Sequence, residues 1–161
     1  MLTAQQEQFL AATAKAAATG NHVFPEMAAC EAALESAWGS SELAREACNL
    51  FGCKQHQHPI YGTISIPTRE FLNARWLTVD ASWIRYPDLA TCFADRMKTL
   101  RNLSGMYPHY SQALGAETPE DYVTQVSMSW STDPDRARNC IEIYHAHKEI
   151  LDAALAGSQE G

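Results

Sequence analysis

The chain has few basic residues, and its acidic residues outnumber them. Of its 161 residues, 12 are Lys or Arg and 19 are Asp or Glu, which gives a formal net charge of -7. No run of Lys or Arg forms a patch that could displace the counterions of a phosphate backbone. We therefore expect no nucleic-acid partner.

A long hydrophobic run is also missing. The longest apolar stretch near the start, residues 9–18, contains Lys15 and follows Glu7 rather than a positively charged segment. A stretch of this length cannot span a bilayer, and it does not resemble a secretory signal peptide. We expect no stable membrane insertion, and synthesis in the cytoplasm without a recognisable signal peptide.

Motifs for zinc or dithiol chemistry are absent as well. The five cysteines include no Cys-x-x-Cys pair, so reduced thiols that pack as small apolar groups are expected. The pairs His56-x-His58 and His145-x-His147 have a spacing that does not place both rings on one side of a helix, and the first pair lies in an expected loop beside Pro59. We expect neither a metal site nor a cofactor.

The chain shows no internal repeat, low-complexity tract or Pro/Ser-rich linker, so residues 1–161 are expected to form one domain. The pattern is mostly helical. A first helix is expected over about residues 3–18, a second from Pro25 to a stop at Gly39, and a short third over 42–47.

Between Ile60 and Tyr86 the pattern changes to that of β-strands. Residues 63–66 alternate between polar and apolar, residues 76–79 are rich in strand formers, and a polar interruption at 73–75 separates them. This predicts a β-hairpin inserted among helices, and therefore the α+β class. The junction of hairpin and helices is the expected ligand cleft.

Helical patterning returns after the hairpin. Apolar residues at helical spacing begin at Leu89, and Thr118-Pro119 and Asp133-Pro134 each place a capping oxygen before a proline at the first helical position. The last helix is expected to continue through Leu151, and residues 156–161 are expected to fray.

Glu35 is the leading candidate for chemistry. It follows Leu34 and precedes Trp38 by three residues, at the edge of a predicted buried stripe. Desolvation by apolar neighbours raises the pKa of a carboxyl group and suits it to general acid catalysis. Position alone favours an exposed helix glutamate instead. Glu31, one turn earlier, has the same two interpretations, with fewer apolar neighbours than Glu35.

Several motifs follow one another in order around and after Glu35. Residues 32–44 are Ala-Ala-Leu-Glu-Ser-Ala-Trp-Gly-Ser-Ser-Glu-Leu-Ala, and residues 49–54 are Asn-Leu-Phe-Gly-Cys-Lys. They resemble bacterial peptidoglycan N-acetylglucosaminidases of glycoside hydrolase family 73, in which a helix is roughly Ala-x-Leu-Glu-Ser-Gly-Trp-Gly and a loop is Asn-Leu-Phe-Gly-Ile-Lys. The resemblance spans about residues 25–151 and continues through Tyr61-Gly62, Thr68-Arg69-Glu70, Trp83-Ile84-Arg85-Tyr86 and Ser131-Thr132-Asp133-Pro134.

The resemblance implies a lysozyme-like fold, with a helical lobe and a small β-hairpin lobe flanking a substrate cleft. It implies endo-acting hydrolysis of the β-1,4 bond between N-acetylglucosamine and N-acetylmuramic acid in the bacterial wall, with Glu35 as the general acid. The alternatives are a muramidase or lytic transglycosylase on the same fold, and an inactive wall-binding module. The implied partner is the peptidoglycan glycan strand, which a monomer would reach after release or non-classical export.

By the same resemblance, Glu70 in the hairpin is a second catalytic candidate, as a base or nucleophile-like partner. A water-activating base is expected roughly 6.5–9.5 Å from the acid, and a protein nucleophile about 5–5.5 Å from it. Attack by the substrate's own 2-acetamido group is a third route. A solvated glutamate, or one paired with Arg69 or Arg75, is the structural alternative.

Aromatic rings are expected to supply the sugar-binding surface, because pyranose C–H faces stack on them. For each ring, packing in the core is the alternative role. Asn49 is a further candidate, with hydrogen bonds to its own loop as its favoured role. The aromatic candidates for substrate binding are Phe51, Tyr61, Tyr107, Tyr110 and Trp130.

Two positions depart from the family pattern. Trp130 stands where the family has a tyrosine before Ala-Thr-Asp-Pro, and Arg136 stands where many members have a second tyrosine. A role carried by either tyrosine hydroxyl therefore does not transfer to this chain.

Overall fold

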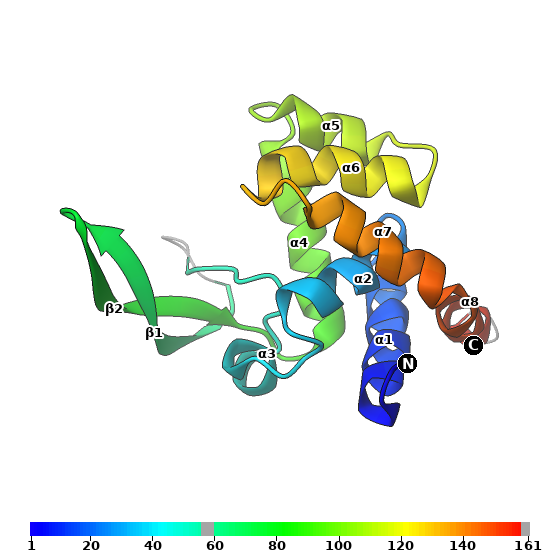
Figure 1. The fold of residues 1–161 in the computed structure, drawn as a ribbon, viewed down its shortest axis with the longest axis horizontal. Helices are drawn as coiled ribbons and strands as arrows, with labels where there is room; N and C mark the ends of the chain where they lie inside the picture. The colour runs from blue at the N-terminus through cyan, green and yellow to red at the C-terminus, as the bar shows by residue number, and fades with distance from the viewer. Residues whose placement is uncertain (56–59, 159–161) are drawn as a thin grey trace.

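A computed structural model describes residues 1–55 and 60–158. Within these residues the chain forms helices around a two-stranded antiparallel hairpin (Figure 1). In chain order the elements are α1 (Ala4–Thr19), α2 (Pro25–Glu35), α3 (Glu42–Ala47), β1 (Gly62–Leu72), β2 (Arg75–Arg85), α4 (Leu89–Leu103), α5 (Pro108–Leu114), α6 (Pro119–Trp130), α7 (Arg136–Ala146) and α8 (Lys148–Ser158).

Helix α2 runs through the middle of the helical body, with α1, α6, α7 and α8 packed around it (Figure 1). Its buried residues include Met27, Cys30 and Ala33, which belong to the larger apolar core. A second apolar cluster lies between the helices and the base of the hairpin, where Ile84 and Tyr86 pack with Phe93. The two clusters hold α2 and the base of the hairpin against the same set of helices.

The expected end of α2 at Gly39 is wrong, because the helix ends at Glu35. The next turn is left-handed, with φ values of 51° at Ala37, 57° at Trp38 and 81° at Gly39. Glycine is required at the last of these positions, since a Cβ there would lie 2.6 Å from the Phe9 ring. The early end places Glu35 at the C-terminal end of the helix instead of within it.

The predicted hairpin is confirmed, and its strands are longer than the alternating segments indicated. β1 and β2 pair in register from Gly62 opposite Arg85 to Leu72 opposite Arg75. The two-residue turn between them, Asn73 and Ala74, has positive φ at both positions, which suits a tight hairpin turn. The hairpin extends away from the helices as an arm (Figure 1).

The C-terminal helices differ from expectation in several places. Thr118 caps α6 as expected, accepting a hydrogen bond from the Asp121 N–H (3.1 Å), but α7 begins only at Arg136. Asp133 instead accepts from the Asp135 N–H (2.9 Å) in the turn before that helix. The expected single last helix is broken at His147 into α7 and α8.

Two further differences concern α5 and α8. Helix α5, which has Pro108 at its first position, was not predicted. Residues 156–158, expected to be frayed, belong to α8, while 159–161 lie outside the described residues. Among residues 1–55 and 60–158, no helix combines the length and apolarity needed to cross a membrane.

Candidate active site

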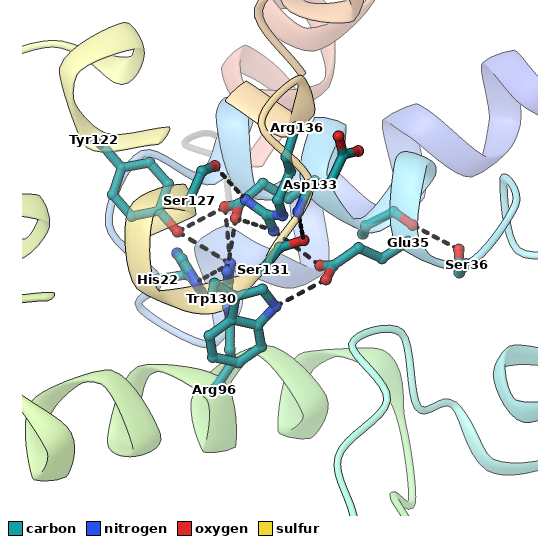
Figure 2. A network of polar contacts seen from close by, with 12 residues as sticks. His22, Glu35, Ser36, Arg96, Tyr122, Ser127, Trp130, Ser131, Asp133 and Arg136 are labelled. Carbon is teal, nitrogen blue, oxygen red and sulfur yellow. Dashed lines mark hydrogen bonds and ion pairs between the residues drawn. The ribbon is translucent and has the colours of Figure 1, made fainter. Parts of the chain in front are cut away.

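Glu35 lies at the end of α2 with its carboxylate held from both sides (Figure 2). The indole N–H of Trp130, at the end of α6, donates to Glu35 Oε1 (2.8 Å). The guanidinium of Arg136, at the start of α7, donates to Oε2 (3.0 Å). With one donor on each oxygen, the plane of the carboxyl group is fixed while its side chain stays 21% exposed.

The environment of Glu35 favours its neutral form. Burial raises the pKa of Glu35, and the positive charges of Arg136 and Arg96 offset this only in part. Its place at the C-terminal end of a helix acts in the same direction as burial, because the helix dipole disfavours a negative charge there. A carboxyl group in this setting can hold a proton and donate it.

Glu31, one turn earlier on α2, is fully buried in an ion-pair network. Arg96 binds it in a bidentate manner at 2.8 and 2.6 Å, and Arg136 donates to Oε2 at 2.7 Å. The Tyr122 hydroxyl donates to Oε1 at 2.6 Å. Burial would raise the pKa of Glu31, but the two guanidiniums outweigh burial and hold it well below its usual range. Glu31 is therefore ionised, and the partners of its buried carboxylate are two guanidiniums and a phenol hydroxyl.

The Arg96 guanidinium is enclosed by two aromatic rings. Its central carbon lies 4.3 Å from the centre of the Phe51 ring and 4.5 Å from that of the Trp130 ring. These contacts are of the cation–π type and gain strength away from water. Trp130 thus contacts Arg96 with its ring and Glu35 with its N–H, which couples the buried network to the partly exposed carboxylate.

His22 completes the buried side of the network (Figure 2). Burial, followed by the charge of Arg96, lowers the pKa of His22 to about 4. The ring is therefore neutral at pH 7. Nδ1 lies 2.7 Å from the Val23 carbonyl oxygen and carries the proton, which leaves Nε2 as the acceptor facing Arg96 at 3.4 Å.

Four of the predicted aromatic residues form a continuous row beside Glu35. Ring centres are 6.3 Å apart between Phe51 and Trp130, 6.3 Å between Trp130 and Tyr110, and 5.4 Å between Tyr110 and Tyr107. Phe51 and Tyr110 are buried, and Tyr107 is 40% exposed. Trp130 connects this row to the Glu35 carboxylate, and the sugar-binding role of the rings stays a prediction.

The other two predicted binding residues lie in the loop and strand junction. Tyr61 packs against Tyr86, with ring centres 5.4 Å apart. Asn49 is buried and donates from Nδ2 to the carbonyls of Cys53 and Ile84, both at 2.9 Å, while its Oδ1 accepts from the Cys53 N–H at 3.0 Å. These bonds tie the loop before the hairpin to β2.

Glu70 has a different setting near the tip of the hairpin. It lies opposite Leu77 in the register, and its side chain is 39% exposed. Lys54 is its ion-pair partner, with Nζ 3.5 Å from Oε1. Arg69, one of its two expected partners, stacks instead over the Trp76 ring, with the guanidinium carbon 5.3 Å from the ring centre. Glu70 therefore belongs to the hairpin arm, whereas Glu35 belongs to the helical network.

No group of three or more His, Cys, Asp or Glu side chains is placed to hold a metal ion within residues 1–55 and 60–158. His145 pairs with Glu120 at 3.0 Å on the surface. His56 and His58 lie outside the described residues.

Known proteins resemble the chain in sequence and in fold. A family model described as "Mannosyl-glycoprotein endo-beta-N-acetylglucosaminidase" matches residues 11–149. The chain belongs to the glucosaminidase family. It is 34% identical over 134 residues to a probable N-acetylmuramidase of Lactococcus lactis subsp. cremoris, covering 78% of this chain and 29% of the relative. It is 31% identical over 118 residues to the exo-glucosaminidase LytG of Bacillus subtilis, covering 72% and 41%. The chain thus spans less than half the length of either relative.

Solved structures share the fold of this glucosaminidase-family chain. The catalytic domain of the autolysin Auto from Listeria monocytogenes superposes with a TM-score of 0.78 at 24% identity, covering 96% of this chain and 89% of that one. A glycoside hydrolase domain of Salmonella typhimurium FlgJ gives 0.72 at 24% identity, covering 89% and 98%. The expected lysozyme-like α+β fold is confirmed.

Sequence reasoning missed most of the buried network of this family member. Arg96 lies on the apolar stripe of α4 beside Phe93 and Met97, and an arginine there signals a buried acidic partner. Glu31, four residues before Glu35 on α2, was the acidic residue that could have been matched to this arginine. Arg136 was noticed only as a departure from the family pattern. Nothing local marked His22 as a neighbour of Arg96, or Tyr122 as a neighbour of Arg96 and Glu31.

Proposed function

We propose that the chain hydrolyses the β-1,4 bond between N-acetylglucosamine and N-acetylmuramic acid in peptidoglycan, with Glu35 as the general acid. The observation that carries this proposal is the difference between the two carboxylates of the network. Glu31 is fully buried and ionised, whereas Glu35 reaches solvent and has a raised pKa. Family membership supplies the reaction class.

The proposed chemistry begins with proton transfer from Glu35 to the glycosidic oxygen. A sugar alkoxide is a poor leaving group, so protonation assists cleavage of the bond to the anomeric carbon of N-acetylglucosamine. Trp130 and Arg136 hold the carboxyl group, so that the proton comes from a fixed position. Water then supplies the hydroxyl of the new reducing end, and Glu35 is reprotonated for the next turnover.

Attack on the anomeric carbon can depend on Glu70 or on the substrate's 2-acetamido group. Within the described residues, Glu70 has no hydrogen bond or ion pair to the network around Glu35, and it pairs with Lys54, which precedes the hairpin. The Glu70→Gln variant separates the routes through the initial rate of cleavage. A loss comparable to that of Glu35→Gln would make Glu70 a base or nucleophile, and a modest loss would favour substrate assistance.

For sugar binding we propose the exposed end of the aromatic row. Tyr107 is 40% exposed, and Trp130 is partly buried beside the acid, so each can present ring surface to a pyranose. Phe51 and Tyr110, which are buried, support these rings from behind.

A muramidase is the second candidate, favoured by the name of the Lactococcus relative, a probable N-acetylmuramidase. Digestion of purified peptidoglycan, borohydride reduction and mass spectrometry distinguish the two. Products that end in reduced N-acetylglucosamine support our proposal. Reduced muramic acid ends would indicate a muramidase, and anhydro-muramic acid a lytic transglycosylase. Retained binding with the same weak turnover in wild type and Glu35→Gln would indicate a wall-binding module.

A further inference from the structure

Arg136 joins the two carboxylates of α2 through a single nitrogen. Its Nη2 donates to Glu31 Oε2 at 2.7 Å and to Glu35 Oε2 at 3.0 Å. Its other terminal nitrogen, Nη1, donates to the Ser127 hydroxyl at 2.8 Å (Figure 2). The Arg136 side chain is 3% exposed, so these bonds are almost shielded from water.

The charges around Glu35 are arranged unevenly. Arg96 and Glu31 form a bidentate buried pair in which each charge neutralises the other. The charge of Arg136 is therefore shared between a carboxylate that is already paired and the carboxylate of Glu35. With Glu35 ionised, the two arginines and two glutamates of the network have no net charge. With Glu35 protonated, the network has a net positive charge.

The other titratable groups near Glu35 leave this balance unchanged. Burial raises the pKa values of Tyr110, Cys53 and Cys140, so all three are neutral at pH 7. Trp130 faces Glu35 with a neutral N–H donor. In the part of the chain that the structure describes, Arg136 is thus the charged group that touches Glu35 directly, with Glu31 and Arg96 next to Arg136.

We propose that Arg136 is a positioning residue for the reaction: by joining Glu35 to the buried Glu31, it fixes the orientation of the acid and sets the charge that the acid experiences. This inference rests on the proposed function, because it assigns Arg136 to the acid of that reaction.

Substitutions on the two sides of Glu35 should act in opposite directions. Arg136→Gln removes the positive charge and should raise the pKa of Glu35. Glu31→Gln removes a negative neighbour and leaves Arg136 to Glu35 alone, which should lower it. Arg136→Lys keeps the charge but cannot bind two carboxylates and Ser127 in the same geometry.

The test is a titration of the Glu35 side-chain carboxyl followed by 13C NMR, with Glu35→Gln used to assign the signal. Arg136→Gln should raise the midpoint by about 1 pH unit or more, and Glu31→Gln should lower it. Ser127→Ala, which removes one hydrogen bond to Arg136 and no charge, is the matched control and should leave it unchanged. An unchanged or lowered midpoint in folded Arg136→Gln would overturn the proposal. If Arg136→Gln does not fold, the proposal is overturned by a Glu35 midpoint that is unchanged or raised in Glu31→Gln.

Activity gives a second readout that a purely structural role would not move. The alkaline limb of the pH dependence of kcat/KM should move to higher pH in Arg136→Gln and stay in place in Arg136→Lys. Arg136→Lys should lower kcat more than it changes KM, because the orientation of the acid is lost while the substrate site remains. An Arg136→Lys enzyme with wild-type kcat would contradict the positioning role. The NMR titration needs no substrate. If the wild type fails to cleave peptidoglycan, the proposed function is wrong, but the NMR midpoints still show whether Arg136 and Glu31 shift the pKa of Glu35.

Discussion

The two catalytic candidates, Glu35 and Glu70, occupy opposite kinds of environment. Glu35 is held by Trp130 and Arg136 at the rim of a buried network drawn from several helices. Glu70 lies on a two-stranded arm, with one ion pair to Lys54 at 3.5 Å. A fixed, partly desolvated carboxyl group is suited to deliver a proton from one place. The position of Glu70, a more exposed carboxyl group, depends instead on where the hairpin lies relative to the helices.

The difference also separates two sources of stability. The helical body contains buried charges, so its stability depends on every charge keeping its partner. The hairpin depends on its own strand pairing, its turn and cross-strand contacts such as that between Phe71 and Trp76, with ring centres 5.4 Å apart. Comparable substitutions in the two regions should therefore have very different costs.

The largest difference is expected for ion pairs. Arg96→Met should lower the free energy of unfolding by about 3–5 kcal/mol, because it leaves Glu31 buried with part of its compensation removed. Lys54→Met, which breaks the exposed pair with Glu70, should cost less than about 1 kcal/mol. Urea denaturation measures both. If the two variants lose the same free energy of unfolding, the stability of the helical body does not depend on its ion pairs more than that of the hairpin does.

The pH dependence of stability should come from the helical network. The pKa of His22 is about 4 in the folded protein, against about 6.5 when unfolded, so the unfolded chain takes up the proton first as the pH falls. Stability should decline between about pH 6.5 and 4, by at most about 3 kcal/mol. His22→Gln should flatten this part of the curve.

Denaturation at a series of pH values checks the His22 prediction. Glu31 does not interfere above about pH 5, because its lowered pKa contributes stability that is lost only as the pH falls below the unfolded value, about 4.3. A wild-type curve as steep as that of His22→Gln would contradict the assignment.

A smaller effect is expected from single indole hydrogen bonds. Trp130→Phe keeps a ring beside Arg96 but removes the donor to Glu35, and should lower kcat roughly tenfold, equivalent to about 1.4 kcal/mol. Trp83 of the hairpin donates to the Ile66 carbonyl at 3.1 Å, so Trp83→Phe is the matched control. Its kcat should stay near that of the wild type. The comparison fails if both variants lose activity to the same extent.

The smallest effect is expected at the tip of the arm. A double-mutant cycle on Phe71→Ala and Trp76→Ala should give a coupling free energy of about 0.2–1 kcal/mol, since both side chains are more than half exposed. Thermal or urea denaturation of the four proteins provides the cycle. A coupling above about 2 kcal/mol would mean that the tip is held more strongly than its strand pairing implies.

Local patterns in the sequence predicted much of the fold, because caps, turns and alternation act over a few residues. The start of α6 at Thr118-Pro119 and the hairpin between residues 62 and 85 are examples. The end of α2 was missed, because three successive left-handed residues, one packed against Phe9, are set by tertiary contact. The break at His147 had no strong local signal.

The site was predictable only in part for the same reason. Glu35 stood out through its motif, and the four rings of the row were named as separate candidates, with no prediction that they would pack against one another. Arg96 and Arg136 come from α4 and α7, and their meeting with Glu31 is a product of helix packing. Periodicity assigns a residue to the inner face of a helix, but it does not show which opposing charge it will meet.

The most direct test of the account is the initial rate at which Glu35→Gln releases new reducing ends from purified peptidoglycan, relative to the wild type. The substitution keeps the shape of the side chain and removes the proton that it donates. We predict a loss of roughly 10²–10⁴-fold in a folded variant, verified by its near-ultraviolet circular dichroism. A folded Glu35→Gln protein that cleaves peptidoglycan at the wild-type rate would contradict the account.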